Sequence, residues 1–463
     1  MSVERWKGAL MRLAGRNRVH VGSDTSAAYR DLAEIYGNTE IIGFPSGETS
    51  GFWSVPNAWE VDGATLKAPD GSVVADWREN KLSLFTYSPP FKGKISLEQL
   101  EDRLFSIPDK PDRTPFHFRN QYRHWDVDWG FCLPDSVRRN LKPGNYEVDI
   151  ATRFVSGEME MLEQVHPGQV DDSLLLVGHF DHPAMCNDGL VGCLAGHEVV
   201  SRLSGRETRL TYRMLSTIEI IGSVFYAAEH VTAKSVRQAL FMATAGARAP
   251  LNYQTSFSGT ASIDRVMTHV FRHYAAKSES ENIHAFRQGP LGNDETAFDV
   301  GGVNIPCGVV MRAPFDEYHT DADNLDAVME ENFEEQVDLV LKAIDILERN
   351  AKLTRRFSGL PCLSNPELDL YLSPSMVSQV RTDGRGDRTF AECSGKALAA
   401  IEKKPDALNH LTNVLPIMCE GDLTTLDVAE KVDLPFELVD VYTDRWSDKG
   451  LLEKEWINPL ASA

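Results

Sequence analysis

The chain has 463 residues, of which 42% are hydrophobic and 25% charged, and this composition is typical of a globular protein with a packed core. Its formal net charge of −21 argues against nucleic acid or an anionic membrane as the main partner, because both bind basic surfaces. The seven cysteines form no CxxC pair, the first residues lack the apolar core of a signal peptide, and no apolar run approaches the ~20 residues of a membrane span. We therefore expect a cytoplasmic protein with two to four domains.

The first 132 residues contain two different patterns. Residues 1–36 have apolar side chains at helical spacing, so we expect helices there. Between residues 41 and 132, short β-prone runs alternate with turn residues such as Asp62-Gly63, which predicts a β-rich inserted domain. Residues 1–40 are assigned with residues 133–355 to one domain.

From about residue 140 the pattern changes to strands that alternate with helices. Leu174–Val177 is a continuous apolar run, as expected of a strand buried on both faces, and residues 189–203 then have a helical pattern. Further strands are predicted at 210–216, 239–244 and 305–311, and an amphipathic helix at 329–350. This alternation predicts an α/β fold with a mostly parallel sheet, in which ligands bind beyond the carboxyl ends of the strands.

The C-terminal part follows a polar stretch at residues 381–388. Helices are predicted at 411–418, 425–431 and 435–446, and a strand at 451–454. Helix, turn, helix, glycine and strand in this order outline a winged helix, which we assign to residues 375–463. Its last helix is more acidic than basic, whereas a helix that enters a DNA groove is basic or neutral, so we do not expect DNA binding.

Imidazole and carboxylate groups gather directly after the buried strand. His179, Asp181, His182 and Asp188 lie within ten residues. In proteins, imidazole and carboxylate groups bind zinc directly or hold its ligands in place. A lone histidine here would be a hydrogen-bonded loop residue, and Asp188 before Gly189 could instead cap a helix. The density of these groups predicts metal binding.

Three further segments carry candidate functional groups. Glu219 is a charge among apolar residues at a strand end, which favours a raised pKa and the role of general base, or that of a metal ligand. His319 follows Tyr318 in an acidic segment that would otherwise be a surface loop. Asp294 and Glu295 could orient a ligand or receive a substrate ammonium group, or they could simply begin a helix.

Taken together, these motifs resemble the bacterial DUF4910 proteins, which are peptidase M28-like zinc aminopeptidases with a C-terminal winged-helix domain. The segments that carry the resemblance begin at His179, Glu219, Gly292 and Tyr318, and further matches extend it over nearly the whole chain. The resemblance implies an M28-like zinc-peptidase core with a β-rich inserted domain and a winged helix.

The resemblance also implies roles for single residues. His179, Asp188 and His319 would be metal ligands, with Asp188 able to bridge two ions, and Asp181 would be the partner of His179. Glu219 would be the base or a further ligand, because the glutamate pair typical of M28 peptidases is not intact here.

Two positions depart from the family pattern. Ala247 stands where the family usually has an acidic residue, and Gln254 where a basic residue is expected. With one ligand missing, we predict about one tightly bound zinc at Asp188, Glu219 and His319. A second ion would be weak unless His182 or Glu295 substitutes.

The predicted function is zinc-dependent hydrolysis of an amide bond in a peptide or small amide, as in an aminopeptidase. One alternative is a specialised amidohydrolase, deacylase or acyl-transfer enzyme of a biosynthetic pathway. Another is a binding protein that has kept a peptidase fold without catalysis. Neither nucleic acid nor membrane is expected as a partner, and a homo-oligomer is compatible with the sequence.

Overall fold

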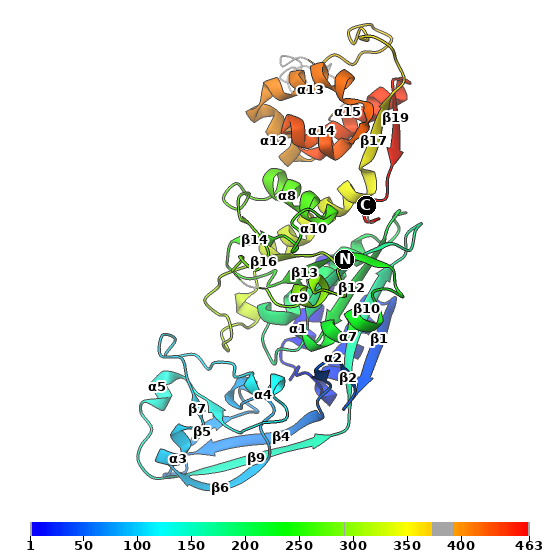
Figure 1. Cartoon of the computed structure of the whole chain (residues 1–463). Helices are drawn as coiled ribbons and strands as arrows, with labels where there is room; N and C mark the ends of the chain where they lie inside the picture. The colour runs from blue at the N-terminus through cyan, green and yellow to red at the C-terminus, as the bar shows by residue number, and fades with distance from the viewer. Residues whose placement is uncertain (1, 291, 373–389, 391–392, 462–463) are drawn as a thin grey trace.

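The computed structural model describes residues 2–290, 292–372, 390 and 393–461. The polar stretch at residues 381–388 lies outside these residues. Figure 1 shows three parts along one axis: a β-rich part at one end, a large sheet with its helices in the middle, and a group of helices at the other end. Within the described residues, no helix has the length and apolar character needed to cross a membrane.

The large sheet has eight strands in the order β1-β10-β12-β11-β13-β16-β14-β15. In that order its strands are Thr39–Pro45, Glu158–His166, Thr211–Thr217, Ser173–His179, Val236–Ala243, Cys307–Arg312, Leu251–Gln254 and Ile283–His284. The four central strands β12, β11, β13 and β16 are parallel, whereas β1, β10 and β14 pair antiparallel with their neighbours towards the centre. The sheet is therefore mixed, with the expected parallel arrangement confined to its centre and to the β14–β15 pair.

Helices cover this sheet in two groups. The helices are α1 (Ser2–Leu13), α2 (Ser23–Tyr36), α6 (Gly192–Arg202), α7 (Ile221–Glu229), α8 (Ser262–Tyr274), α9 (Glu295–Asp299) and α10 (Glu330–Arg349). α6 packs against α1 and α10, and α7 packs against α9. Because β12 and β13 lie on opposite sides of β11, right-handed crossovers through α6 and α7 place these helices on opposite faces. All seven residues of β11 are buried between them, as its apolar run predicted.

The β-rich part is built around a four-stranded antiparallel sheet with the order β5-β4-β9-β6. Its strands are Val73–Asp76, Ala58–Lys67, Asn145–Val155 and Phe91–Ser96. Its smaller elements are β7 (Leu104–Phe105), β8 (Phe131–Cys132), α3 (Leu97–Glu101), α4 (Arg119–Tyr122) and α5 (Asp135–Arg138). The separate hairpin of β2 (Thr49–Ser50) and β3 (Trp53–Ser54) contacts α7. The long strand β9 lies beyond residue 132 and pairs with β4, so the β-rich sheet uses residues on both sides of that expected boundary of the insert. At the other boundary, β1 pairs with β10 in the large sheet.

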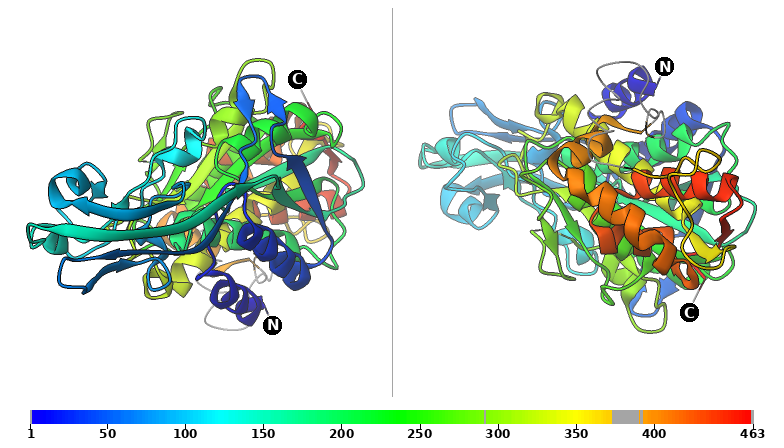
Figure 2. Two further views of the ribbon diagram at one scale, coloured as in Figure 1. Left: turned by 90° about the horizontal axis from the view of Figure 1, so that it is seen from below. Right: turned by 90° about the horizontal axis from the view of Figure 1, so that it is seen from above.

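The C-terminal part contains helices and a three-stranded sheet in the order β18-β17-β19. Its elements are β17 (Ala351–Arg355), α12 (Gly395–Lys403), α13 (Pro405–Met418), β18 (Glu420–Thr424), α14 (Thr425–Val432), α15 (Phe436–Asp448) and β19 (Leu452–Trp456). Its buried side chains, among them Leu353, Leu438 and Trp446, form a core separate from that of the large sheet. Figure 2 shows these helices from above, stacked over the large sheet. Its assignment as a winged helix stays a prediction.

Candidate functional site

The candidate residues meet at the carboxyl edge of the parallel strands. β11 ends at His179, β12 ends two residues before Glu219, and β13 ends at Ala243. This edge also contains the point where consecutive strands are added on opposite sides of β11, which is where open α/β sheets bind ligands.

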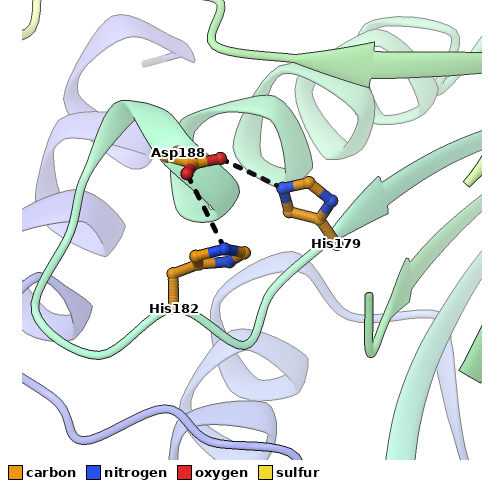
Figure 3. A group of neighbouring side chains, drawn as sticks. All are labelled: His179, His182 and Asp188. Atoms are coloured by element: carbon orange, nitrogen blue, oxygen red, sulfur yellow. Dashed lines mark hydrogen bonds and ion pairs between the residues drawn. The ribbon is translucent and has the colours of Figure 1, made fainter. Parts of the chain in front are cut away.

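Asp188 lies at the centre of the site, between three imidazoles. Its carboxylate oxygens lie 3.3 Å from Nε2 of His179, 2.9 Å from Nε2 of His319 and 3.7 Å from Nε2 of His182. Figure 3 shows His179, His182 and Asp188 pointing toward one another from the end of β11 and the turn before α6. The structure therefore brings together the three ligands that the resemblance implied, and His182, which the sequence suggested as a further ligand, lies at a comparable distance.

The backbone around Asp188 is shaped to present this carboxylate. Gly189 has a φ of 107°, a conformation that favours glycine. The buried carboxylate of Asp323 accepts hydrogen bonds of 2.8 Å from both the Asn187 and the Asp188 backbone N–H. The turn is thus fixed by an acidic side chain from the segment that also carries His319.

The protonation states of Asp188 and His182 suit a cation. Burial alone would raise the pKa of Asp188, but His182 and hydrogen bonds from His179 and His319 hold it well below its usual value. Burial lowers the pKa of His182 to about 4, so this imidazole is neutral near pH 7. Within the part of the chain that the structure describes, His182 Nδ1 is buried without a hydrogen-bond partner. A charged carboxylate among imidazole nitrogens fits the donor set of zinc.

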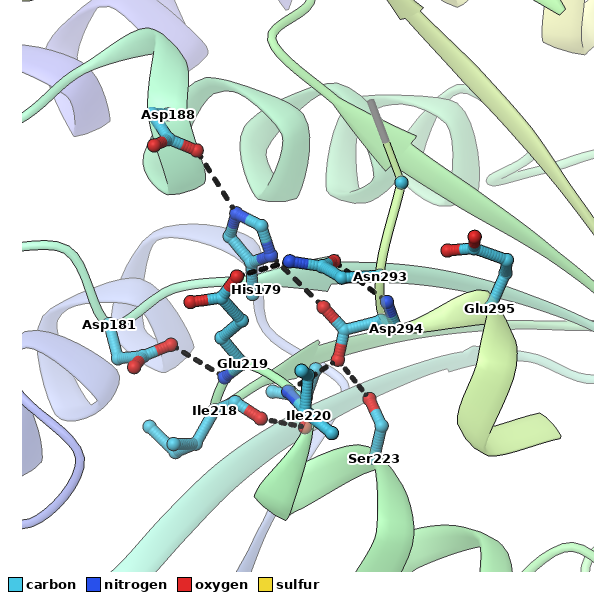
Figure 4. A network of polar contacts seen from close by, with 12 residues as sticks. His179, Asp181, Asp188, Ile218, Glu219, Ile220, Ser223, Asn293, Asp294 and Glu295 are labelled. Carbon is cyan, nitrogen blue, oxygen red and sulfur yellow. Dashed lines mark hydrogen bonds and ion pairs between the residues drawn. The ribbon is translucent and has the colours of Figure 1, made fainter. Parts of the chain in front are cut away.

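Asp294 holds His179 in place. Its carboxylate lies 3.0 Å from Nδ1 of His179 and accepts hydrogen bonds from Ser223 Oγ at 2.6 Å and from the Ile220 N–H at 2.9 Å (Figure 4). Hydrogen bonds to Asp188 and Asp294 outweigh burial and raise the pKa of His179 well above its usual value. The remaining nitrogen, Nε2, is turned toward Asp188.

The expected partnership between Asp181 and His179 is corrected by this geometry. Phe180 donates its backbone N–H to Thr217, which extends the pairing with β12 and carries Asp181 away from the His179 ring. Asp181 instead accepts a 2.7 Å hydrogen bond from the Glu219 backbone N–H and lies 3.1 Å from Nε2 of His20. Burial raises the pKa of Asp181, but the His20 contact overcomes this and lowers it to about 2.

Glu219 has a defined set of neighbours at the end of β12. The hydroxyl of Tyr122 donates to its Oε2, the side-chain amide of Asn293 donates to its Oε1, and His182 Nε2 lies 3.6 Å from Oε2. Burial raises the pKa of Glu219 to about 7, and Asp181 acts in the same direction. The following residue, Ile220, has a φ of 59°, a strained value for a β-branched side chain and one often found at functional sites.

Aromatic residues of the β-rich part cover the site, and their role could not be inferred from the sequence. Phe116 donates its backbone N–H to the His319 carbonyl at 2.9 Å, and its ring lies 5.4 Å from that of His182. Phe118 lies with its ring 5.2 Å from that of His319. The only signal was the density of aromatic residues near Tyr122, which gives no partner for them.

Tyr318 and Glu295 have different surroundings. The ring of Tyr318 stacks on that of His319 with 3.9 Å between centroids. Glu295 is fully buried and accepts hydrogen bonds from Gln254 and Arg287 rather than facing the three histidines.

At the end of β13, the residues that line the site's cavity are Phe241, Ala243 and Thr244. Ala247 is buried, and its carbonyl accepts a 2.8 Å hydrogen bond from the Asn332 side chain. None of these three lining residues has a carboxylate that could serve as a further ligand.

Known proteins with similar sequences or folds agree with this architecture. A relative from Clostridium acetobutylicum, described as a candidate polysaccharide biosynthesis protein with an aminopeptidase-like domain, is 30% identical over 314 residues, which are 67% of this chain and 70% of the relative. The crystal structure of a candidate peptidase from Clostridium acetobutylicum matches with a TM-score of 0.81 at 24% identity, covering 98% of this chain and 96% of that one. A zinc aminopeptidase from Bacillus subtilis matches with a TM-score of 0.53 at 12% identity over 74% of this chain and 94% of its own.

These structural likenesses identify the fold as aminopeptidase-like. The model of the family described as a domain of unknown function, DUF4910, matches residues 10–350. Because this match covers most of the chain and includes the site, the chain belongs to the DUF4910 family.

Proposed function

We propose that the protein is a zinc-dependent hydrolase of amide bonds that acts like an aminopeptidase. The observation that carries this proposal is the convergence of three imidazoles on Asp188 beside Glu219. His179, Asp188 and His319 would hold the metal, with His182 in reach as a further ligand. When bound, zinc lowers the pKa of its water toward ~7 and polarises the substrate carbonyl.

Glu219 supplies proton transfer. A general base works best when its pKa is close to the operating pH, and burial raises the pKa of Glu219 to about 7. It takes the proton of the attacking water and delivers it to the leaving amine. Tyr122 and Asn293 fix its carboxylate from both oxygens, and Asp181 fixes its backbone.

A second candidate function is a specialised amidohydrolase or deacylase of a biosynthetic pathway. The name of the Clostridium relative, which mentions polysaccharide biosynthesis, favours it. Both candidates use the same residues, and they differ in the substrate.

A panel of aminoacyl arylamides and N-acylated amino sugars, assayed with the zinc-loaded protein, separates the two. Turnover of several aminoacyl arylamides that is lost with a chelator and restored by zinc supports the aminopeptidase. Turnover of the N-acyl sugars alone supports the deacylase. A zinc-loaded protein inactive on both sets contradicts amide hydrolysis and favours a binding protein on a peptidase fold.

A further inference from the structure

A cavity of about 270 Å³ opens beside the metal-site residues. Asp188 and Glu219 line one part of it, and Phe241, Ala243 and Met311 provide an apolar wall from the ends of β13 and β16. Ligand pockets usually begin at roughly 300 Å³, so this cavity is suited to one short side chain rather than a long chain.

Arg287 also lines this cavity, and its guanidinium group is anchored on one side. Nη1 donates to Oε1 of Glu295 at 3.0 Å and to the carbonyl of Gly292. Glu295 is fully buried and is held in turn by Gln254, whose Nε2 lies 3.3 Å from Oε1. The backbone of Arg287 has a φ of 57°, a strained conformation that is found where the surrounding structure fixes a residue.

The rest of the guanidinium group is available to a ligand. Among the residues that the structure describes, no hydrogen bond is recorded for Nε or Nη2 of Arg287, and 49% of its side chain is exposed. A planar guanidinium that is already oriented binds a carboxylate through two parallel N–H···O bonds.

The charges of the cavity orient such a ligand. Among the described residues that line the cavity, Arg287 is the only arginine or lysine, so a substrate carboxylate is favoured at its end of the cavity. The apolar wall of Phe241, Ala243 and Met311 suits the aliphatic part of such a ligand. A short group with a carboxylate at its end matches this distribution.

We propose that Arg287 recognises a carboxylate of the substrate, so that the substrates are short acidic amides such as those with N-terminal glutamate or aspartate. This inference rests on the proposed amide hydrolysis for the reaction, but the recognition itself is a binding property. It is therefore tested by binding as well as by turnover.

The binding test uses isothermal titration of the zinc-loaded protein with L-glutamate and with its neutral isostere L-glutamine. We expect glutamate to bind at least about tenfold more tightly, and Arg287→Gln to remove most of this preference because the charge and the fork of donors are lost. Arg287→Lys keeps a cation beside Glu295 and lacks the fork, so it should fold normally and still lose most of the preference. The exposed Arg272 on α8 provides the control variant Arg272→Gln, which should bind as the wild type does.

The kinetic test compares glutamyl and glutaminyl arylamides by kcat/KM in the same four proteins. Equal binding of glutamate and glutamine by the wild type, or a preference unchanged in Arg287→Lys, overturns the inference whether or not an arylamide is hydrolysed. An Arg287-dependent preference in binding without turnover of any arylamide supports the inference and contradicts the proposed reaction.

Discussion

At the scale of single residues, Glu219 is placed between opposing influences. Burial and the charge of Asp181 raise its pKa, whereas the charge of His179 and the hydrogen bond from Tyr122 lower it. The resulting pKa of about 7 leaves the carboxylate able both to accept and to release a proton near neutral pH. A glutamate on the surface would be a weaker base in this role.

Replacement of this carboxylate tests the role directly. We expect Glu219→Gln to lower kcat by about 10²- to 10⁴-fold, because the amide keeps the shape and loses the base. The measurement is kcat on any amide that the wild type hydrolyses, with circular dichroism and zinc content to show that the fold and the metal are retained. Wild-type turnover in this variant would exclude Glu219 from proton transfer.

Tyr122 is expected to position Glu219. We expect Tyr122→Phe to lower kcat by about tenfold with little change in KM, because the loss of one hydrogen bond frees the carboxylate without altering the substrate cavity. Tyr212→Phe is the matched control, because Tyr212 donates a 2.7 Å hydrogen bond to Glu348 away from the site. An equal loss of activity in both variants would indicate a general effect of stability instead.

At the scale of secondary-structure elements, local patterns predicted the site only in part. The apolar run of β11 and the groups after it identified His179 and Asp188, because a strand end and its loop are encoded locally. The partnership of Asp294 with His179 joins residues 115 positions apart, and spacing along the chain contains no information on such a contact. The same applies to Tyr122, which comes from the β-rich part.

The contact between α8 and α15 has a built-in pH dependence. His269 on α8 is buried, and its Nε2 accepts a 2.9 Å hydrogen bond from the Phe436 backbone N–H at the start of α15. Burial, together with the nearby charges of His273 and Arg272, lowers the pKa of His269 to about 3. This imidazole must be neutral to accept the bond.

The sign of the effect follows from the two protonation states. Below its ordinary pKa of 6.5, unfolded His269 takes up a proton that the folded state does not bind until the pH nears about 3. The contribution of the neutral His269 imidazole to the free energy of unfolding is thus complete above pH 6.5. It decreases as the pH falls, by at most about 1.4 kcal/mol per pH unit.

Chemical denaturation between pH 7 and pH 4.5 measures this dependence. His269→Gln keeps a side-chain acceptor without a titrating group, so we expect its stability to decrease less steeply with falling pH than that of the wild type. Identical slopes for the two proteins would show that His269 does not couple protonation to the contact between α8 and α15.

At the scale of the whole molecule, the site joins parts that are distant in the chain. The large sheet supplies His179 and Glu219, the segment before α10 supplies His319, and the β-rich part covers them with the ring of Phe118 and the hydroxyl of Tyr122. The sequence predicted the class of each part from its periodicity. Their packing depends on contacts between parts, which periodicity does not describe.

A metal ion bound by such distant segments should stabilise the folded chain. A ligand that binds only the native state at 100 times its Kd adds about 2.7 kcal/mol, so we expect a chelator to lower the melting temperature and zinc to restore it. His319→Ala should lower the zinc content and reduce the chelator effect. The exposed His410 on α13 provides the control His410→Ala, which should retain both.

The number of bound ions follows from the supply of ligands. A two-metal site needs a bridging carboxylate and at least two more ligands on each ion. Asp188 can bridge two ions, but Ala243 and Thr244, which line the site at the end of β13, have no carboxylate to offer a second ion. Glu295 is not available either, because it accepts hydrogen bonds from Gln254 and Arg287.

We therefore expect about one tightly bound zinc per chain, because with Glu219 acting as the base only three imidazoles remain beside Asp188, one fewer than two ions need. Elemental analysis of the purified protein after dialysis against a weak chelator provides the measurement. Two stoichiometric ions that survive this dialysis would contradict the prediction, and their loss one at a time in His182→Ala and His319→Ala would identify which imidazole holds each.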